Sequence, residues 1–386
     1  DGANSQGMDV IRIGLASTDM LYFASGKLNL PGIMFTASHN PAQYNGMKLC
    51  KSGAKPIGQE SGLLTIKQLI QEGIAISNRP VGTIRKMDLL DDYVTYLIDR
   101  FPKKTFKKRN LKVVIDAGNG MAGFTAPSVM KKLNVELIPM YFELDGNFPN
   151  HEANPIEPKN LKDLQKKVKK EKADLGLAFD GDADRCFLVD ENADLVNPSS
   201  LTALIAVREL KRNPGASIIY NLISSKAVPE IILENGGKPV RSRVGHSYIK
   251  SLMAQTGAVF GGEHSGHFYF ADFWRADSGM LAALYALAEL MDSPKTLSEI
   301  LKPFDRYFSS GEINTRVKDS SKSIKLVKEK YEKENEVDEF DGLTVSSKKW
   351  WFNLRPSNTE PLLRLNVEAD SPKLMVEIRD TVLSLI

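Results

Sequence analysis

Three aspartates stand at alternate positions in the segment DGDADR at 180–185. Carboxylates spaced in this way, and joined by small residues, can converge on one hard cation. Oxygen-only ligands disfavour zinc and iron. The apolar runs 175–179 and 186–189 on either side predict strands. We therefore expect a loop between two strands that binds Mg²⁺ through Asp180, Asp182 and Asp184.

An EF-hand is the alternative for this segment, because its loop also has acids at positions one, three and five, and Glu191 falls at position twelve. Position six would be Arg185, where an EF-hand requires glycine, and the flanks favour strands over helices. Arg185 itself could hold a phosphoryl group or form a structural ion pair with a loop aspartate.

A hydroxyl that could complete the metal shell is offered by Ser38, in the segment TASHNP at 36–41. The apolar run 33–35 predicts a strand before it, and a residue that precedes proline favours a turn. Three carboxylates leave coordination positions open, and Mg²⁺ favours phosphate oxygens there. A phosphoryl group on Ser38 would fill one, with His39 and Lys48 close in sequence. The alternative is a capping serine in a turn.

A second polar loop, GGEHSGH at 261–267, alternates Glu263 and Ser265, a carboxylate and a hydroxyl that suit adjacent hydroxyls of a sugar. The alternative is a zinc site at His264 and His267, but no third ligand is near in sequence. His246, in the segment GHS at 245–247, offers another imidazole, or else caps a helix.

The segment RPSNTEP at 355–361 combines an arginine, hydroxyls, an amide and turn backbone between two apolar strands. Such donors form an anion-binding nest that suits phosphate. An ordinary polar turn is the alternative. The candidate ligands are Arg355, Ser357, Asn358 and Thr359.

Strands and helices must hold these loops in place. Hydrophobic periodicity and turn residues predict an alternation of strands and helices from the start of the chain to residue 305. The lysine-rich segment 159–172 has apolar residues at helical spacing and predicts a helix with a solvated face. Further strands are predicted at 10–14, 33–35, 47–49, 112–116, 135–141, 175–179, 186–189, 217–220, 239–240 and 258–260, and further helices at 17–26, 63–71, 198–212, 279–291 and from residues 225 and 246.

From residue 306 the pattern has fewer strand–helix alternations, with strands near 312–317, 344–345, 350–353 and 362–367 and helices at 321–333 and the C-terminus. Trp350 and Trp351 are expected in the core. We predict an α/β protein of three similar mixed-sheet α/β domains followed by a smaller α+β domain, with boundaries at 1–86, 87–196, 197–305 and 306–386.

Composition limits the classes of function. The chain has 386 residues and a net charge of +3 with nearly balanced signs, which implies no general attraction to nucleic acid or to an anionic membrane. Its two cysteines, Cys50 and Cys186, form no paired motif and suit a reducing compartment. The most apolar run, 279–291, is too short to span a bilayer. We expect a cytoplasmic protein.

The four polar segments at 36–41, 180–185, 262–267 and 355–361, in this order, resemble the phosphoserine, metal, sugar and phosphate loops of the α-D-phosphohexomutase family. The resemblance covers essentially the whole chain and is nearest to the bacterial phosphomannomutase/phosphoglucomutase branch. It implies four domains around a central cleft.

By this resemblance Ser38 is the phosphorylated residue and binds Mg²⁺ together with the three aspartates. Lys48 and His246 stand where family members place proton-transfer or substrate-contacting groups, His39 neighbours the phosphoserine, and Arg185 belongs to the metal loop. The sugar hydroxyls are expected at Glu263 and Ser265, and the substrate phosphate at Arg355, Ser357, Asn358 and Thr359.

The implied activity interconverts hexose 1-phosphate and hexose 6-phosphate of mannose or glucose, with a hexose 1,6-bisphosphate as intermediate and activator, in a monomer or homodimer. The alternatives are a phosphoglucosamine or phosphoacetylglucosamine mutase, a phosphosugar phosphatase, or a truncated, inactive phosphosugar-binding protein.

Two departures from the family pattern accompany the resemblance. Family members have a strand and a basic arm before the point where this chain starts, so the N-terminal part of the first domain is expected to be missing. The segment 221–226 lacks a lysine at the position matched to a substrate contact, and Lys226 is the candidate substitute.

Overall fold

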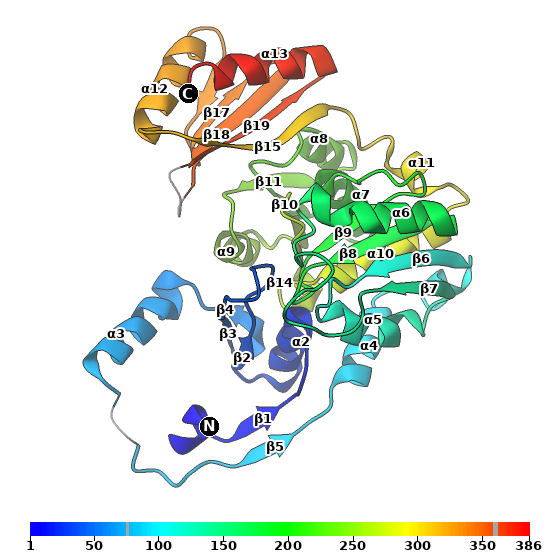
Figure 1. Cartoon of the computed structure of the whole chain (residues 1–386), viewed down its shortest axis with the longest axis vertical. Helices are drawn as coiled ribbons and strands as arrows, with labels where there is room; N and C mark the ends of the chain where they lie inside the picture. The colour runs from blue at the N-terminus through cyan, green and yellow to red at the C-terminus, as the bar shows by residue number, and fades with distance from the viewer. Residues whose placement is uncertain (75–76, 358–361) are drawn as a thin grey trace. The chain divides into compact units, whose positions relative to one another are not determined.

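The computed structural model describes residues 1–74, 77–357 and 362–386, except for the side chains of Glu60, His246 and Ser247. The chain folds into two compact units (Figure 1). The first is formed by Asp1–Pro198 with Ser265–Ile300, and the second by Ser199–His264 with Leu301–Ile386. Each unit therefore combines segments that are far apart in the sequence.

The N-terminal part of the first unit has two small sheets. One is a parallel pair of β1 and β5, and the other is the antiparallel order β2-β3-β4. The buried residues of α2, such as Met20 and Phe23, form the core here. The elements are α1 (Gly2–Ser5), β1 (Val10–Arg12), α2 (Thr18–Leu28), β2 (Gly32–Phe35), β3 (Met47–Lys51), β4 (Lys55–Pro56), α3 (Leu64–Glu72) and β5 (Ile84–Lys86).

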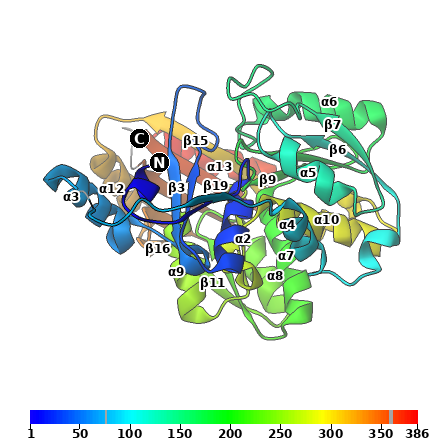
Figure 2. The same ribbon diagram turned by 90° about the horizontal axis from the view of Figure 1, so that it is seen from below.

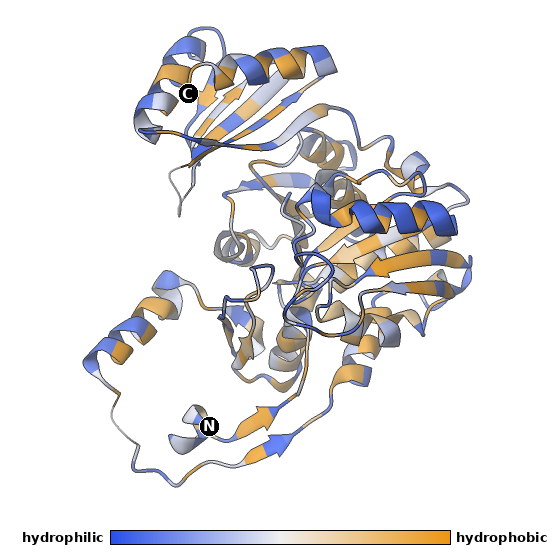
Figure 3. Ribbon diagram, viewed as in Figure 1, coloured by the Kyte–Doolittle hydropathy of each residue, from blue (hydrophilic) through white to orange (hydrophobic). Residues whose placement is uncertain are grey.

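A four-stranded mixed sheet, in the order β7-β6-β8-β9, follows in the same unit. β6 is parallel to both neighbours, and β9 returns antiparallel to β8. Helix α6 lies on the outside of the sheet (Figure 2) and covers one face through Leu164 and Val168. The rest of the helix is mostly hydrophilic (Figure 3), and most of its lysines are exposed. The elements are α4 (Leu90–Ile98), β6 (Leu111–Asp116), α5 (Ala122–Met130), β7 (Val135–Met140), α6 (Lys162–Glu171), β8 (Leu175–Phe179) and β9 (Cys186–Val189).

The first unit is completed by the hairpin of β13 (Phe268–Phe270) and β14 (Ala276–Asp277) and by helix α10 (Gly279–Asp292). Almost every residue of α10 is buried, which explains its apolar sequence without a membrane. Among the described residues, no helix is long and apolar enough to cross a bilayer. Both cysteines are buried and free.

In the second unit, β10 lies between β11 and β12 in parallel pairing. Two parallel strands that follow each other in the sequence need a crossover connection, usually a helix. Helices α8 and α9 make these connections, in agreement with the alternation of strands and helices predicted from the sequence. The elements are α7 (Pro198–Arg212), β10 (Ser217–Asn221), α8 (Ala227–Glu234), β11 (Lys238–Ser242), α9 (His246–Thr256) and β12 (Phe260–Gly262), and the short helix α11 (Leu297–Leu301) spans the later boundary of the two units.

The C-terminal part is an antiparallel sheet in the order β15-β19-β18-β17-β16, with α12 and α13 packed on one face (Figure 1). Trp350 packs against this core and Trp351 is 9% exposed, which confirms the prediction that both are core residues. The elements are β15 (Phe308–Arg316), α12 (Ser320–Tyr331), β16 (Glu336–Asp338), β17 (Leu343–Ser346), β18 (Trp350–Pro356), β19 (Leu362–Ala369) and α13 (Pro372–Leu383).

The predicted fold class, α/β domains followed by an α+β domain, is confirmed. The helix predicted over 159–172 begins as a 3-10 turn at Pro158–Leu161 and continues as α6. Short strands such as β4, β13, β14 and β16 are not predicted, because two or three residues carry too little periodicity. The nine-residue helix α4 is also absent from the predicted elements.

Candidate active site

Ser38 lies in the loop of a β-hairpin. β2 and β3 pair antiparallel with Met34 opposite Lys48, so residues 36–46 leave the sheet and Lys48 stands near the base of the loop. A backbone hydrogen bond closes a turn over residues 37–40, as the Asn-Pro pair predicts. Ser38 has a φ of 54°, a left-handed conformation that costs a non-glycine residue about 1–3 kcal/mol.

Asp180, Asp182 and Asp184 lie in the loop of a second hairpin, where Phe179 pairs with Cys186. All three are at most 1% exposed, and one carboxylate oxygen of each lies within 4.8 Å of the others. The flanking strands confirm the predicted strand–loop–strand arrangement. The EF-hand alternative is wrong, because an EF-hand has helices on both sides of its loop.

The two hairpin loops meet. Ser38 Oγ donates a hydrogen bond to Asp180 Oδ2 at 3.0 Å, and Thr36 Oγ1 donates to Asp182 Oδ2 at 3.0 Å. Between them, a Cβ on Gly181 would lie 2.4 Å from the Ser38 carbonyl oxygen. A glycine is therefore required at 181 for the loops to approach this closely.

Three buried carboxylates here face two cations. Lys48 Nζ lies 2.7 Å from Asp182 Oδ2 and also contacts Asp184, and Arg185 Nε lies 3.3 Å from Asp180 Oδ2. Within the described part of the chain, Asp182 Oδ1 is buried without a hydrogen-bond partner. The three carboxylates carry more negative charge than the two cations offset, and Asp182 Oδ1 lacks a hydrogen-bond donor. A hard divalent cation would satisfy both, so the cluster suits a divalent metal site.

The charges of the cluster shift each other's titration. Burial, and then the charges of Asp184 and Asp182, raises the pKa of Asp180 well above its usual range. Burial lowers the pKa of Lys48, but the same two carboxylates outweigh it and hold that pKa well above its usual value. Lys48 is therefore an ammonium at neutral pH, and acts here as a charge.

His39 differs from Lys48 in being neutral. Its Nδ1 lies 3.2 Å from Ser38 Oγ, and Arg185 Nη2 contacts the same ring. Burial, followed by the charge of Arg185, lowers the pKa of His39 to about 4. The imidazole is therefore neutral at pH 7, and its low pKa makes it a weak base there. The structural ion pair that the sequence left open for Arg185 is present, since it contacts Asp180.

Two helices begin at the acidic loop. At the start of α2, Thr18 N donates to the Asp182 carbonyl at 2.9 Å and Thr18 Oγ1 donates to Asp182 Oδ2 at 2.7 Å. At the start of α10, a Cβ on Gly279 would lie 2.7 Å from the Arg185 carbonyl oxygen. Helix N-termini carry partial positive charge and stabilise nearby carboxylates.

His267 connects the predicted sugar loop to the metal loop. Arg185 and His267 form an isolated β-bridge, His267 Nε2 lies 3.5 Å from Asp184 Oδ1, and Ser265 Oγ lies 3.1 Å from His267 Nδ1. Asp277 adds a third potential metal ligand beside His267 and Asp184. Ser265 is therefore positioned next to the acidic cluster through His267.

Glu263 lies in the second unit, directly after β12, and is 1% exposed. Its Oε1 accepts a hydrogen bond from Gly245 N at 3.1 Å, so the carboxylate stands at the start of α9, the helix that begins with His246. The neighbouring His264 Nδ1 lies 3.3 Å from Ser199 Oγ, and burial lowers the pKa of this imidazole.

Arg355 stands on β18 directly opposite Arg364 on β19. Both contact Glu312, at 3.0 Å from Arg355 Nη2 to Oε2 and 3.7 Å from Arg364 Nη1 to Oε1, and Arg364 Nη2 lies 3.5 Å from Ser357 Oγ. Among the described residues, the buried Nε atoms of both arginines have no hydrogen-bond partner. Two positive charges directly opposite each other on neighbouring strands repel. The carboxylate of Glu312 neutralises only one of them, so the pair of arginines can still bind a further anion.

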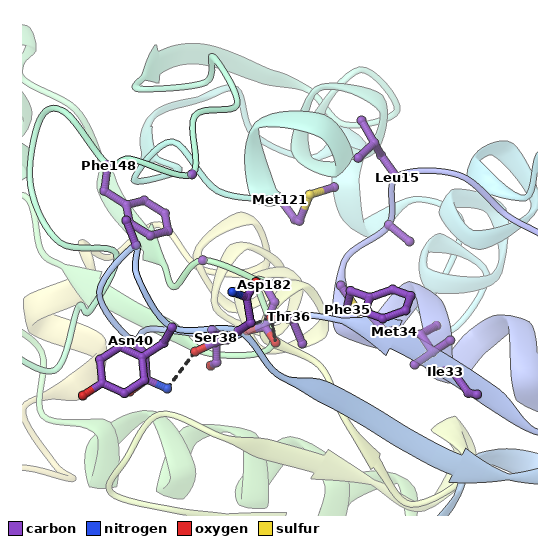
Figure 4. Close-up of a pocket in the computed structure, with 18 of the residues that line it drawn as sticks. Leu15, Ile33, Met34, Phe35, Thr36, Ser38, Asn40, Met121, Phe148 and Asp182 are labelled. Carbon is purple, nitrogen blue, oxygen red and sulfur yellow. Dashed lines mark hydrogen bonds between the residues drawn. The ribbon is translucent and has the colours of Figure 1, made fainter. Parts of the chain in front are cut away.

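A cavity of about 520 Å³ adjoins Ser38 in the first unit. Figure 4 shows the segment from Thr36 to Ser38 on one side and apolar side chains, among them Met121 and Phe148, around the rest. The cavity wall therefore joins the hairpin of Ser38 to loops of the neighbouring four-stranded domain.

Comparison with protein families matches four successive segments of the chain. The families are the phosphoglucomutase/phosphomannomutase α/β/α domains I, II and III and the C-terminal domain of the same proteins. The matched residues are 1–75, 91–193, 197–307 and 312–385, respectively.

Similar proteins cover nearly the whole chain. A phosphomannomutase of Methanocaldococcus jannaschii is 40% identical over 385 residues, which are 98% of this chain and 84% of that protein. The chain belongs to the phosphoglucomutase/phosphomannomutase family. A protein of this family from Burkholderia thailandensis has a similar structure, with a TM-score of 0.88 at 33% identity, covering 100% of this chain and 84% of the other.

Curated members of the family also include phosphohexose mutases of Xanthomonas campestris, 37% identical over 98% of this chain and 85% of the relative. This member is accordingly a phosphohexomutase, an intramolecular phosphotransferase.

The predicted site residues of this family member fall into two groups. Ser38, His39, Lys48, Arg185, the three aspartates and Ser265 lie in the first unit, and Glu263, Arg355 and Ser357 lie in the second. The side chain of His246, and all of Asn358 and Thr359, lie outside the described residues. The structure adds Thr18, His267 and Arg364 to the predicted set. His267 belongs to the polar segment 261–267 and Arg364 to the predicted strand 362–367, whereas no pattern in the sequence marked Thr18 as a site residue.

Proposed function

We propose that the enzyme interconverts hexose 1-phosphate and hexose 6-phosphate of mannose or glucose, with Mg²⁺ and through a phosphoryl group on Ser38. One observation carries the proposal: Ser38 Oγ lies 3.0 Å from Asp180 Oδ2, within a cluster of three buried carboxylates. A serine in that position gains a role when phosphorylated, because it then brings phosphate oxygens to a metal-binding loop.

In the first half-reaction a sugar hydroxyl oxygen forms a bond to phosphorus while the bond from phosphorus to Ser38 Oγ breaks. In the second, Ser38 Oγ forms a bond to the other phosphorus while the bond from that phosphorus to its sugar oxygen breaks. The hydroxyl proton needs an acceptor on the side of phosphorus opposite Ser38 Oγ, because the attacking and leaving oxygens lie roughly in line. His39, whose Nδ1 lies 3.2 Å from Ser38 Oγ, is placed beside the leaving oxygen. Mg²⁺ held by Asp180, Asp182, Asp184 and the phosphorylated Ser38 would neutralise charge on the transferring group. Lys48 and Arg185 place further positive charge beside it.

The product of the first half-reaction is a hexose 1,6-bisphosphate, which must return its other phosphoryl group to Ser38. Glu263 and Ser265 are proposed to bind the sugar hydroxyls that are shared by both orientations. The phosphate that is not reacting is proposed to bind Arg355, Ser357, Asn358 and Thr359, with Arg364 as a second cation. Free bisphosphate is the expected activator, because it can phosphorylate Ser38 in resting enzyme.

The proposal is tested on Ser38→Ala with Ser5→Ala, an exposed hydroxyl of the same unit, as control. Turnover of mannose 1-phosphate and glucose 1-phosphate should fall by several orders of magnitude in Ser38→Ala while substrate still binds. Peptide mass spectrometry of active wild-type enzyme should place the phosphate on Ser38. A phosphate on another residue, or steady release of inorganic phosphate in place of isomerisation, would overturn the proposal.

A further inference from the structure

The loop of residues 142–154 carries a single large aromatic side chain that lines the Ser38 cavity, Phe148. The neighbouring residues Asn147, Pro149 and Asn150 are exposed, whereas Phe148 is half-buried. Phe148 also has a φ of 51°, which an aromatic residue rarely adopts. Figure 4 shows its side chain among those that line the cavity, on a different segment from Ser38.

Asn119 holds the first half of this loop through both its backbone and its side chain. Its Nδ2 donates to the Glu143 carbonyl at 2.9 Å, and its carbonyl accepts from Asp145 N at 3.1 Å. Its Oδ1 accepts from Asn150 Nδ2 at 2.9 Å. Phe148 N in turn donates to the Asp145 carbonyl at 3.1 Å, which fixes the backbone at the aromatic ring.

His151 holds the second half. Its Nε2 lies 2.9 Å from Oδ2 of the buried Asp116, at the end of β6, and its Nδ1 lies 2.8 Å from the Glu152 carbonyl. Asp116 Oδ1 accepts from Gly118 N at 2.9 Å. The loop is therefore attached to the turn at 116–120 from both ends.

The same turn contacts the metal loop. Met121 N donates to the Gly181 carbonyl at 2.9 Å, and a Cβ on Gly120 would lie 2.6 Å from that oxygen. Gly181 is also the residue that touches the Ser38 carbonyl. A continuous set of contacts thus leads from the loop of Phe148 to the loop of Ser38, and it sets the distance between them.

We infer that Phe148 closes one side of the Ser38 cavity against water, and so determines whether the phosphoryl group of Ser38 passes to a sugar hydroxyl or to water. His151 is the positioning residue that keeps Phe148 there. The inference rests on the proposed function of Ser38. In the competing reaction a water oxygen bonds to phosphorus, the bond to Ser38 Oγ breaks, Ser38 regains a proton and inorganic phosphate leaves. An apolar wall slows this reaction by excluding its nucleophile.

The experiment phosphorylates the full chain with hexose 1,6-bisphosphate, removes the sugar, and follows the loss of phosphate from Ser38 by intact-protein mass spectrometry. It also measures the ratio of inorganic phosphate released to hexose 6-phosphate formed during turnover. The variants are Phe148→Ala, Phe148→Leu and His151→Gln. Leu144→Ala is the matched control, because Leu144 is 39% exposed on the same loop and does not line the cavity.

In Phe148→Ala the phosphate-release ratio should rise on the order of tenfold or more, with a matching shorter lifetime of phosphorylated Ser38. Phe148→Leu should recover most of the lifetime, since it restores an apolar wall, and His151→Gln should lie between. Leu144→Ala should match wild type. A variant that folds poorly should lose isomerisation and phosphate release together. The ratio of phosphate released to hexose 6-phosphate formed therefore distinguishes entry of water from a folding defect.

An unchanged ratio in Phe148→Ala that still isomerises sugars would overturn the inference and leave the proposed function intact. An equal rise in Leu144→Ala would also overturn it, because the effect would then belong to the loop in general. Wild type that neither becomes phosphorylated on Ser38 nor isomerises a sugar phosphate would instead overturn the proposed function. If Phe148→Ala does not fold, the Phe148→Leu and His151→Gln lifetimes decide in the same way.

Discussion

At the scale of single residues, the site depends on side chains whose charge is set by their neighbours. His39 is held neutral by burial and Arg185, while Lys48 is held charged by Asp182 and Asp184. Two basic residues near the same serine thus differ in charge at neutral pH, since His39 is neutral and Lys48 is an ammonium. Their positions in the sequence do not distinguish them.

Asp182→Asn should weaken Mg²⁺ binding and lower turnover far more than substrate affinity. Asp182 Oδ2 accepts hydrogen bonds from Thr18, Thr36 and Lys48, which leaves Oδ1 for a cation. The metal acts on the transferring group, so its loss affects the transition state. A Mg²⁺ titration of activity checks this, with the exposed Asp163→Asn as control; an unchanged titration removes Asp182 from the metal site.

Arg355→Ala and Arg364→Ala should each weaken hexose 1-phosphate, hexose 6-phosphate and bisphosphate about ten- to a hundred-fold, because a charge-assisted hydrogen bond contributes about 1.5–3 kcal/mol. Arg355→Lys should recover only part, since lysine lacks the two-pronged geometry. Direct binding measurements test this, with Arg316→Ala on β15 as control. Unchanged hexose 6-phosphate affinity in both alanine variants would assign the C-terminal domain another role.

At the scale of elements, the first unit works by bringing two hairpin loops into contact. β2–β3 carries Ser38 and β8–β9 carries the aspartates, and the N-termini of α2 and α10 both face the acidic loop. Short antiparallel hairpins fix the loop ends, and the helix dipoles offset part of the cost of burying three carboxylates. The contact at Gly181 sets how closely the loops approach.

Gly181→Ala should separate the loops, because the new Cβ would lie 2.4 Å from the Ser38 carbonyl and must displace backbone. We expect a loss of about 1–3 kcal/mol in unfolding free energy and a fall in turnover of more than tenfold from misplacement alone. Thermal unfolding and the rate of Ser38 phosphorylation measure the two effects. Gly146→Ala, whose Cβ meets nothing within 4 Å, should change neither; equal losses in both variants would contradict the explanation.

At the scale of the whole molecule, the predicted ligands are divided between two compact units. The metal loop and Ser38 belong to the first, and Glu263 and Arg355 belong to the second. The proposed function therefore gives each unit its own ligand chemistry, a cation in the first and a phosphate in the second. The central cleft implied by the family resemblance stays a prediction.

This division predicts separate ligand effects in amide hydrogen exchange. Mg²⁺ alone should protect residues 180–185 and the start of α2, and hexose 6-phosphate alone should protect β18 and β19. Saturation at a hundred times the dissociation constant should stabilise the native protein by about 2.7 kcal/mol in each case. Asp182→Asn should abolish only the first effect and Arg355→Ala only the second. Protection of β18 and β19 by Mg²⁺ in the absence of sugar would contradict the assignment.

The sequence by itself determined the local structures that carry the chemistry. Apolar runs on both sides of residues 180–185 specify strands, and three aspartates at alternate positions in so short a loop must lie close together. Asn40 before Pro41 likewise specifies the turn at Ser38. These features are local, so backbone preference and hydrophobic period are enough to predict them.

Only the tertiary structure decided which of these loops meet. Ser38 contacts Asp180 across 142 positions of sequence, and Thr18 contacts Asp182 across 164, so no local pattern encodes either contact. Arg364 joins Arg355 through strand register, and His267 joins Asp184 through a bridge between loops. Such contacts follow from how complete faces of sheets and helices pack, and that packing depends on residues throughout the chain.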